Sequence, residues 1–304
     1  MLWKYKYRPE IIEDICGNND VIFKLKETIS HSHNVIVYGN HGIGKNLTIK
    51  CILNELEAKS EDIYRINACS DRGIKTIRGA LATFLKFKTE GKKYVIIEDI
   101  INLSHGSQHG LCSIMEKFNN ACFIFCTNNY QYVIESIQSR CYFFPLQTIQ
   151  KDELKQYAIS ILKKENILFD NEIFDILYDF TKGDVRRYII NLQSASLGTK
   201  HIKTEDLFKV IKKPFSNTME KIVEYTQKND RLVCMEEINL LLNQGYNHGD
   251  IIKYLFDFCL ECDLEQDIKL KYLDCIGQAQ ITNARGLYSN IQLDNLMIEL
   301  CQLT

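Results

Sequence analysis

Four short apolar runs alternate with stretches of helical periodicity between residues 34 and 145, and this alternation limits the possible folds more than any other feature. The runs are NVIVYG, IYRIN, YVIIED and CFIFCTN, and the stretches between them repeat apolar residues every three or four positions. Strands that alternate with helices pair in parallel, because each return passes along a face of the sheet. The sequence therefore predicts an α/β domain whose parallel sheet is covered on both faces.

A glycine-rich loop follows the first apolar run directly. Its sequence, GNHGIGKN, has the glycines and the lysine of a phosphate-binding loop, placed between a strand and a helix as that motif requires. Glycines let the backbone aim N–H groups at a phosphate, and Lys45 would reach the terminal phosphates. We expect ATP or ADP here; the alternative is an ordinary turn with an exposed lysine. The predicted loop contacts are Gly39, Asn40, His41, Gly42, Ile43, Gly44, Lys45 and Asn46.

Polar residues end two of the later strands. Glu98 and Asp99 follow YVII, and Asn128 ends CFIFCTN. The carboxyl ends of parallel strands meet at the sheet edge where ligands bind. The acidic pair is predicted to hold Mg²⁺ and polarise water, and Asn128 to sense the terminal phosphate. A solvated strand end is the alternative for the carboxylates, and the presence of all three elements in the expected order weakens it.

Strand signals stop after Pro145, and short amphipathic helices with capping residues follow. We expect three domains: a parallel-sheet domain at 1–146, a small helical domain at 147–213 and an all-helical domain at 214–304. The twelve cysteines lie in apolar segments, which favours reduced thiols over a disulfide framework. Cys259 and Cys262 lack further zinc ligands at finger spacing and are expected to be helical core thiols. The basic segment 84–94 is expected to be a solvated loop.

Eight motifs occur in a fixed order: WKYKYRP, ICGNN, the glycine-rich loop, INACSDRGIKTIRG, VIIED, TNN, IQSRC and GDVRRYIINLQ. This order resembles the small subunits of replication factor C, the AAA+ sliding-clamp loader. The C-terminal stretches NQGYNHGDIIKYLF and NARGLYSNIQLDNLMIEL are similar to the family's collar helices, so the resemblance covers essentially the whole chain. It implies an AAA+ ATPase domain, a helical lid and a collar within a hetero-pentamer that places a sliding clamp on primed DNA.

The resemblance also implies roles for individual residues. Asn128 would be the first sensor, and Arg186 of the lid the second. Arg140 would be an arginine finger acting on ATP held by a neighbouring subunit, a contribution worth ~10³ to 10⁵ in rate. Without the family context, Arg140 would be expected in a surface ion pair. The residues expected beside the adenine are Lys6, Tyr7, Arg8, Pro9, Gly17 and Asn18.

Three departures from an active member put hydrolysis in doubt. Asn46 replaces the hydroxyl residue that binds Mg²⁺, so a metal held by Asn46 and Glu98 should bind weakly. The usual Asp–Glu order is reversed in Glu98–Asp99, and neighbouring strand residues cannot exchange roles because they face opposite sides. Asn40 and His41 stand where the family commonly has proline. We expect nucleotide binding with slow or absent hydrolysis at this site.

Two further surfaces follow from the resemblance. Arg72, Lys75 and Arg78 lie at a helix start and would hold DNA phosphates without reading sequence; a solvated basic face is the alternative. In the collar, an apolar stripe is expected to pack between subunits, although by itself it could equally be internal core. The residues of this stripe are Ile251, Ile252, Leu255 and Phe256.

Two other hypotheses stay open at this point. The chain could bind nucleotide only to hold a ring together, or it could be a stand-alone AAA+ remodeller such as a helicase loader or branch-migration motor. The formal charge of −2 argues against a chain coated with basic residues, and no apolar run is long enough to cross a bilayer. We expect an intracellular protein, nuclear in a eukaryotic cell or at the replication site of a large DNA virus.

Overall fold

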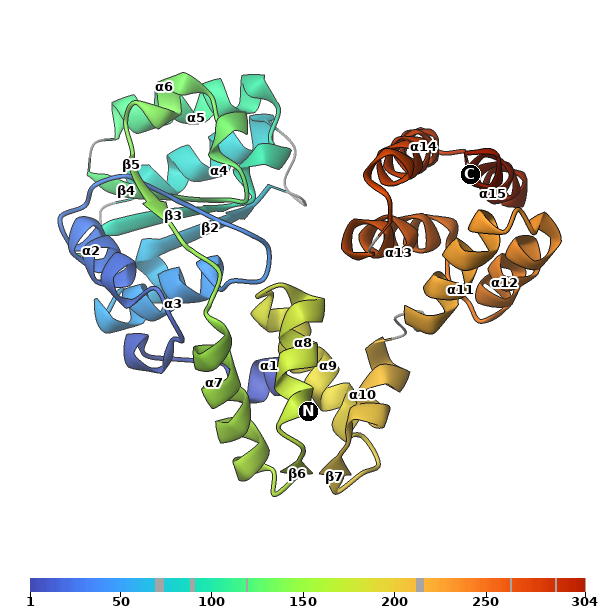
Figure 1. Cartoon of the computed structure of the whole chain (residues 1–304). Helices are drawn as coiled ribbons and strands as arrows, with labels where there is room; N and C mark the ends of the chain where they lie inside the picture. Colours follow the sequence, from blue (N-terminus) through green and yellow to red (C-terminus); the bar gives the residue numbers. More distant parts are fainter. Residues whose placement is uncertain are drawn as a thin grey trace. The chain divides into compact units, whose positions relative to one another are not determined.

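The structure is a computed structural model, and its chain divides into two compact units, Met1–Ile211 and Lys212–Thr304 (Figure 1). The two units are described separately. The described residues are 1–68, 74–87, 91–118, 120–211, 216–262, 264–287 and 289–303. None of the described helices combines the length and the apolar character that crossing a membrane takes.

The first unit contains a parallel sheet of five strands in the order β2-β3-β4-β1-β5. Four of them correspond to the predicted apolar runs. The fifth, β5, was not predicted; it lies at the edge beside β1 and leaves most of its side chains exposed. The bounds are β1 Val35–Tyr38, β2 Ile63–Asn67, β3 Lys93–Glu98, β4 Ala121–Thr127 and β5 Tyr142–Pro145.

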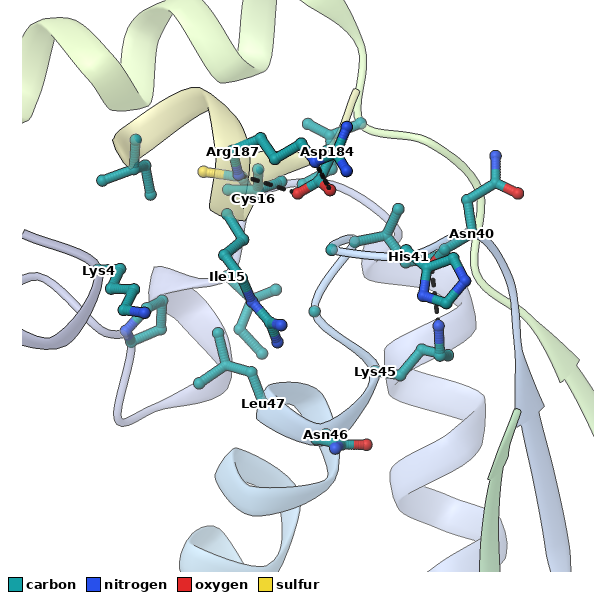
Figure 2. Close-up of a pocket in the computed structure, with 18 of the residues that line it drawn as sticks. Lys4, Ile15, Cys16, Asn40, His41, Lys45, Asn46, Leu47, Asp184 and Arg187 are labelled. Carbon is teal, nitrogen blue, oxygen red and sulfur yellow. Dashed lines mark hydrogen bonds and ion pairs between the residues drawn. The ribbon is translucent and has the colours of Figure 1, made fainter. Parts of the chain in front are cut away.

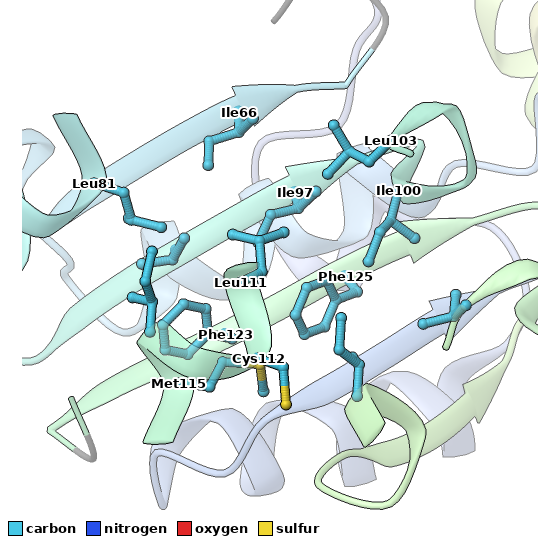
Figure 3. Close-up of a cluster of buried hydrophobic side chains, with 14 of the residues drawn as sticks. Ile66, Leu81, Ile97, Ile100, Leu103, Leu111, Cys112, Met115, Phe123 and Phe125 are labelled. Atoms are coloured by element: carbon cyan, nitrogen blue, oxygen red, sulfur yellow. The ribbon is translucent and has the colours of Figure 1, made fainter. Parts of the chain in front are cut away.

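Alternation along β4 builds a separate core on each face of the sheet. Phe123 and Phe125 pack with α4, α5 and α6 on one face (Figure 3), whereas Cys122, Ile124 and Cys126 pack with α2 and α3 on the other. This is the covered sheet that the sequence predicts. The helices are α2 Asn19–Ser30, α3 Lys45–Glu55, α4 Ile74–Lys86, α5 His105–Lys117 and α6 Glu135–Gln138. Short 3₁₀ helices span Ile12–Asp14, Ser60–Asp62, Ile100–Asn102 and Tyr130–Tyr132.

Segment 84–94 is only in part the solvated loop that was expected. Gly91 and Lys92 are exposed and belong to no helix or strand, residues 88–90 lie outside the described part, and the two ends belong to regular elements. Its first residues close α4, and its last begin β3. Lys93 is only 3% exposed, and its ammonium donates to the carbonyls of Phe84, at 2.6 Å, and Phe87. These contacts satisfy carbonyl groups at the end of α4 that have no partner within the helix.

A helical layer completes the first unit. It has its own apolar core, which includes Trp3 from the N-terminus, 5% exposed. Two strands of two residues each, β6 and β7, pair within it, so strand structure does not end at Pro145 as predicted. The bounds are α1 Trp3–Lys6, α7 Lys151–Lys164, β6 Leu168–Phe169, α8 Glu172–Thr181, α9 Val185–Ser196, β7 His201–Ile202 and α10 Thr204–Ile211.

The second unit is built from helices around one core. Ile251, Ile252 and Leu255 are buried inside this core, and Phe256 packs against it partly buried. The expectation that this stripe packs between subunits is therefore wrong, and the internal-core alternative holds. Cys259 is buried in the same core, while Cys262 ends its helix half-exposed. The helices are α11 Ser216–Gln227, α12 Arg231–Asn243, α13 His248–Glu261, α14 Gln266–Ala284 and α15 Asn290–Gln302.

Candidate nucleotide-binding site

The glycine-rich loop joins β1 to α3 and turns through backbone conformations that side chains disfavour. Gly44 has φ +100° and immediately precedes α3, which begins at Lys45. Gly42 has φ +72°, and a Cβ atom there would lie 1.8 Å from Oδ1 of Asp184. Glycine is therefore required at position 42 for two independent reasons, its backbone angle and the approach of the Asp184 carboxylate.

The Lys45 ammonium lies at the centre of this loop with neutral partners only. It donates to the carbonyls of Gly39 and Asn40, both at 2.8 Å, and to Oδ1 of Asn128 at 2.7 Å. The side chain is 9% exposed, and burial lowers the pKa of Lys45. None of the hydrogen-bond partners that the described residues give this ammonium carries a charge, and Asp99 and Asp184 act on it only from a distance. An anionic phosphate group can supply a counter-charge in direct contact.

A cavity of about 960 Å³ opens around the loop (Figure 2). The loop, the N-terminal segment and the start of α9 all contribute to its walls. Twelve of the predicted site residues line it, which brings together positions up to 178 residues apart. They are Arg8, Pro9, Asn40, His41, Gly42, Ile43, Gly44, Lys45, Asn46, Asp99, Asn128 and Arg186.

Other predicted residues lie near the cavity without lining it. The Lys6 ammonium and the Tyr7 hydroxyl both donate to Oε1 of Glu165 at 2.7 Å, which attaches the N-terminal segment to the end of α7. Asn18 and Gln147 exchange two hydrogen bonds, Nδ2 to the carbonyl at 2.9 Å and backbone N to Oδ1 at 2.8 Å. These residues hold the polypeptide around the cavity. Gly17, Gly39 and Glu98 are likewise outside its lining.

The two acidic residues after β3 differ in their relation to the cavity. Asp99 lines it and has φ +50°, whereas Glu98 does not line it. Asn46 also lines the cavity, but Thr48, the nearest hydroxyl in α3, is 1% exposed and does not. Thr48 therefore cannot replace the missing hydroxyl at position 46. Among the described residues, no group of three His, Cys, Asp or Glu side chains is placed to hold a metal.

Sequence reasoning missed Asp184, which the structure places against the loop. Its Oδ1 accepts a hydrogen bond from the backbone N of Arg187 at 3.0 Å and so caps α9, and Oδ2 lies 3.7 Å from Nε of Arg187 (Figure 2). The sequence indicates a capping residue at the start of this helix, but no local signal places Asp184 against the loop. Cys16 and Tyr157 also line the cavity; burial raises the pKa of the Cys16 thiol to about 11.

Arg140 lies away from the cavity, at the end of α6. Its NH2 group is 2.7 Å from Oε1 of Glu116, and its NH1 group donates to the carbonyl of Ser136 at 2.7 Å. The surface ion pair is the arrangement expected for an arginine without family context. Arg72 lies outside the described residues, as do the side chains of Lys75 and Arg78, so the predicted DNA contacts cannot be placed.

Fold and site together define an AAA+ nucleotide-binding protein. The model of the ATPase family associated with various cellular activities matches residues 35–146, and the model of the replication factor C C-terminal domain matches residues 214–299. The chain belongs to the replication factor C small-subunit family. It is thus a clamp-loader ATPase subunit of DNA replication that works with other clamp-loader subunits.

Full-length relatives agree with this assignment. Replication factor C subunit 4 of Saccharomyces cerevisiae is 26% identical over 99% of this chain and 96% of its own length. A putative replication factor C small subunit of Acanthamoeba polyphaga mimivirus is 25% identical over 98% and 96%. Among solved structures, the Thermotoga maritima RuvB Holliday junction branch migration motor shares the fold, with a TM-score of 0.57 and 17% identity over 72% of this chain and 78% of that chain.

Proposed function

We propose that this subunit binds ATP or ADP in the cavity around Lys45 and hydrolyses ATP slowly or not at all in that site. The observation that carries nucleotide binding is the desolvated Lys45 ammonium, whose three partners are all neutral oxygens. Its charge is uncompensated by direct contacts, and α3, which begins at Lys45, offers the unpaired backbone N–H groups of a helix start to an anion. Arg186, which lines the same cavity, supplies a second positive group from α9.

Weak hydrolysis follows from the groups that would hold Mg²⁺ and water. Bound with a nucleotide, Mg²⁺ would neutralise phosphate charge, and it prefers oxygen ligands in octahedral geometry. The cavity offers the Asn46 amide and the Asp99 carboxylate, whereas Thr48 is buried and Glu98 lies outside the lining. We propose that these two residues hold the metal weakly. The carboxylate would then come from Asp99 rather than from Glu98.

We further propose that Arg140 acts on ATP held by a neighbouring subunit of a hetero-pentamer. Its separation from the cavity of its own chain supports a role in trans. The decisive comparison is ATP turnover by the assembled complex with Lys45→Ala, Asp99→Ala or Arg140→Ala in this subunit alone. We expect little change for the first two and a loss of ~10³-fold or more at the neighbouring site for the third.

The measurement separates the proposal from its alternatives. If Arg140→Ala leaves turnover and clamp loading at the normal rate, the role in trans is wrong. A purely structural role predicts normal turnover for all three variants. If Lys45→Ala or Asp99→Ala lowers turnover as much as Arg140→Ala, this site hydrolyses ATP itself.

We propose a sliding clamp and primed DNA as the other partners of the complex. Arg72, Lys75 and Arg78 would contact DNA phosphates. Lys75 and Arg78 belong to α4, a helix that Leu81 and Leu85 anchor in the core of the sheet domain. Replacing the three basic residues by glutamine should weaken DNA binding equally for unrelated sequences and reduce its dependence on salt. Unchanged salt dependence would exclude this contact.

The collar role is proposed for exposed rather than buried residues of the second unit. Leu232 of α12 is 76% exposed and Ile291 of α15 is 77% exposed, although both are large and apolar. Side chains of this kind are available for packing against other subunits. A stand-alone remodeller is not favoured, because the match to the replication factor C C-terminal domain covers residues 214–299 of the helical unit that spans 212–304.

A further inference from the structure

The guanidinium of Arg140 is held in place by its own chain although it is partly exposed. Glu116, in the last turn of α5, accepts from NH2 at 2.7 Å, and the carbonyl of Ser136 accepts from NH1 at the same distance. The two side chains are 41% exposed for Arg140 and 54% exposed for Glu116. Two anchors from two different helices fix the orientation of the guanidinium plane.

The same contacts use only some of the N–H donors of the Arg140 guanidinium and leave the others available to bind a phosphate. A guanidinium carries five N–H donors. NH1 uses its hydrogens on Ser136 and, at 3.4 Å, on the Ser139 hydroxyl, while NH2 uses one on Glu116. Within the described residues, the Nε hydrogen and the second NH2 hydrogen have no protein partner. They can bind a phosphate oxygen without breaking either anchor.

A buried side chain also packs beneath the Arg140–Glu116 ion pair. The buried thiol of Cys112 lies 3.9 Å from Oε1 of Glu116 and 3.7 Å from the Ser136 carbonyl, the two groups that hold Arg140. A shallow hollow bounded by Asn34, Met115, Glu116 and Arg140 opens beside it. Glu116 therefore contacts a buried side chain of its own helix as well as the Arg140 guanidinium.

We propose that Glu116 is a positioning residue that holds Arg140 ready for the nucleotide of the neighbouring subunit. An exposed arginine samples many rotamers, and each productive encounter must then immobilise it. The Glu116 carboxylate restricts this freedom in advance, with the free N–H edge left for the phosphate. This inference rests on the proposed role of Arg140 in trans. The opposite arrangement, a latch that must open, would require the phosphate to displace Glu116.

The test is a double-mutant cycle in the assembled complex. Glu116→Ala should lower kcat at the neighbouring site by about tenfold and leave KM unchanged. This loss lies between the small effect of removing an exposed ion pair and the ~10²-fold cost of a misplaced catalytic group. Glu116→Gln keeps an acceptor oxygen and should retain most of the rate. In the Arg140→Ala background, Glu116→Ala should have no further effect. Glu135→Gln, an exposed carboxylate at the start of α6, is the matched control.

Each other outcome identifies what fails. If Arg140→Ala has no effect, the role in trans fails and the inference fails with it. If Arg140→Ala lowers the rate but Glu116→Ala does not, only the inference fails. A faster reaction with Glu116→Ala indicates a latch and overturns the positioning role of Glu116. An equal loss of rate in the unmodified subunit and in the Arg140→Ala background shows that Glu116 acts independently of Arg140. The thermal unfolding of each variant subunit, measured alone, detects a loss of folding.

Discussion

Replacing Gly42 by alanine tests whether the loop and the helical layer of the first unit are packed as closely as the structure indicates. The new Cβ would lie 1.8 Å from Oδ1 of Asp184, so the carboxylate must withdraw by about 1.6 Å before an ordinary contact of 3.4 Å is reached. That same oxygen caps α9 by accepting from the backbone N of Arg187. Gly42→Ala should therefore strain the loop and break a helix cap at once.

The cost has two parts of similar size. An L-residue in the left-handed region loses about 1–2 kcal/mol, and φ at Gly42 is +72°. Loss of an aspartate cap costs about 1 kcal/mol. We expect Gly42→Ala to lower the free energy of unfolding of the first unit by about 2–3 kcal/mol. Gly198→Ala is the matched control, because φ there is +84° and no heavy atom lies within 4 Å of the added Cβ.

The chain contains a suitable probe for this measurement. Trp3 is its single tryptophan, and it is 5% exposed in the core of the helical layer. Its fluorescence during urea unfolding therefore reports on the first unit alone. Gly198→Ala should cost about 1–2 kcal/mol, the backbone part only. In an Asp184→Ala background, where the carboxylate is absent, Gly42→Ala should cost no more than this control.

Two results would refute the reasoning. Equal costs for Gly42→Ala and Gly198→Ala would show that the carboxylate does not press on the loop. Additive costs for Gly42→Ala and Asp184→Ala would show that the two residues do not interact, because contacting residues are expected to deviate from additivity.

Four other predictions concern the nucleotide and the assembly. Because burial lowers the pKa of Lys45, ADP affinity measured by calorimetry should fall as pH rises through that lowered value, whereas Lys45→Arg, which keeps its charge, should show no such fall. Asn46→Thr should raise Mg²⁺ affinity and turnover on the order of tenfold, measured in the assembled complex; an unchanged rate would remove Asn46 as the cause of slow hydrolysis. Iodoacetamide should alkylate Cys16 faster as pH rises toward the thiol's pKa of about 11, and saturating ADP should protect the thiol, with mass spectrometry as the readout. Leu232→Lys should weaken assembly in gel filtration and leave the fold intact, whereas Ile251→Lys should unfold the second unit, because it buries a charge in the core.

The sequence predicted four strands of the sheet because each contains a short run rich in apolar residues; β1, β3 and β4 are almost entirely buried, whereas β2 buries only Ile66. β4 is buried at every position from Ala121 to Thr127, so its pattern is strong. β5, Tyr142–Pro145, was missed because its four residues lie at an exposed edge and the run ends in proline. The buried stripe of α13 was assigned to the wrong partner, because periodicity shows which side of a helix is apolar but not what covers it.

Contacts in and around the cavity also differ in how far the sequence predicts them. Lys45 and Asn128 could be paired from the sequence, because the loop and a neighbouring strand must meet at one edge of the sheet. Nζ of Lys45 lies 2.7 Å from Oδ1 of Asn128. The bonds from Lys6 and Tyr7 to Glu165 could not, since they cross about 160 residues and depend on how the N-terminal helix packs against α7. Local motifs predict the phosphate ligands, but tertiary packing decides which of the remaining residues line the cavity.

The placement of Asp184 suggests how nucleotide charge would act on the helical layer. Its carboxylate lies against Gly42, in the loop that is expected to take a phosphate, and two negative groups cannot share that position at low cost. Arg187 lies 3.7 Å from the carboxylate and offsets part of its charge, and Arg186 lines the same cavity. A phosphate on the loop therefore repels Asp184 and attracts the two arginines on the same turn of α9. Because these groups are adjacent at one helix start, a phosphate bound to the loop would act on all three charges together.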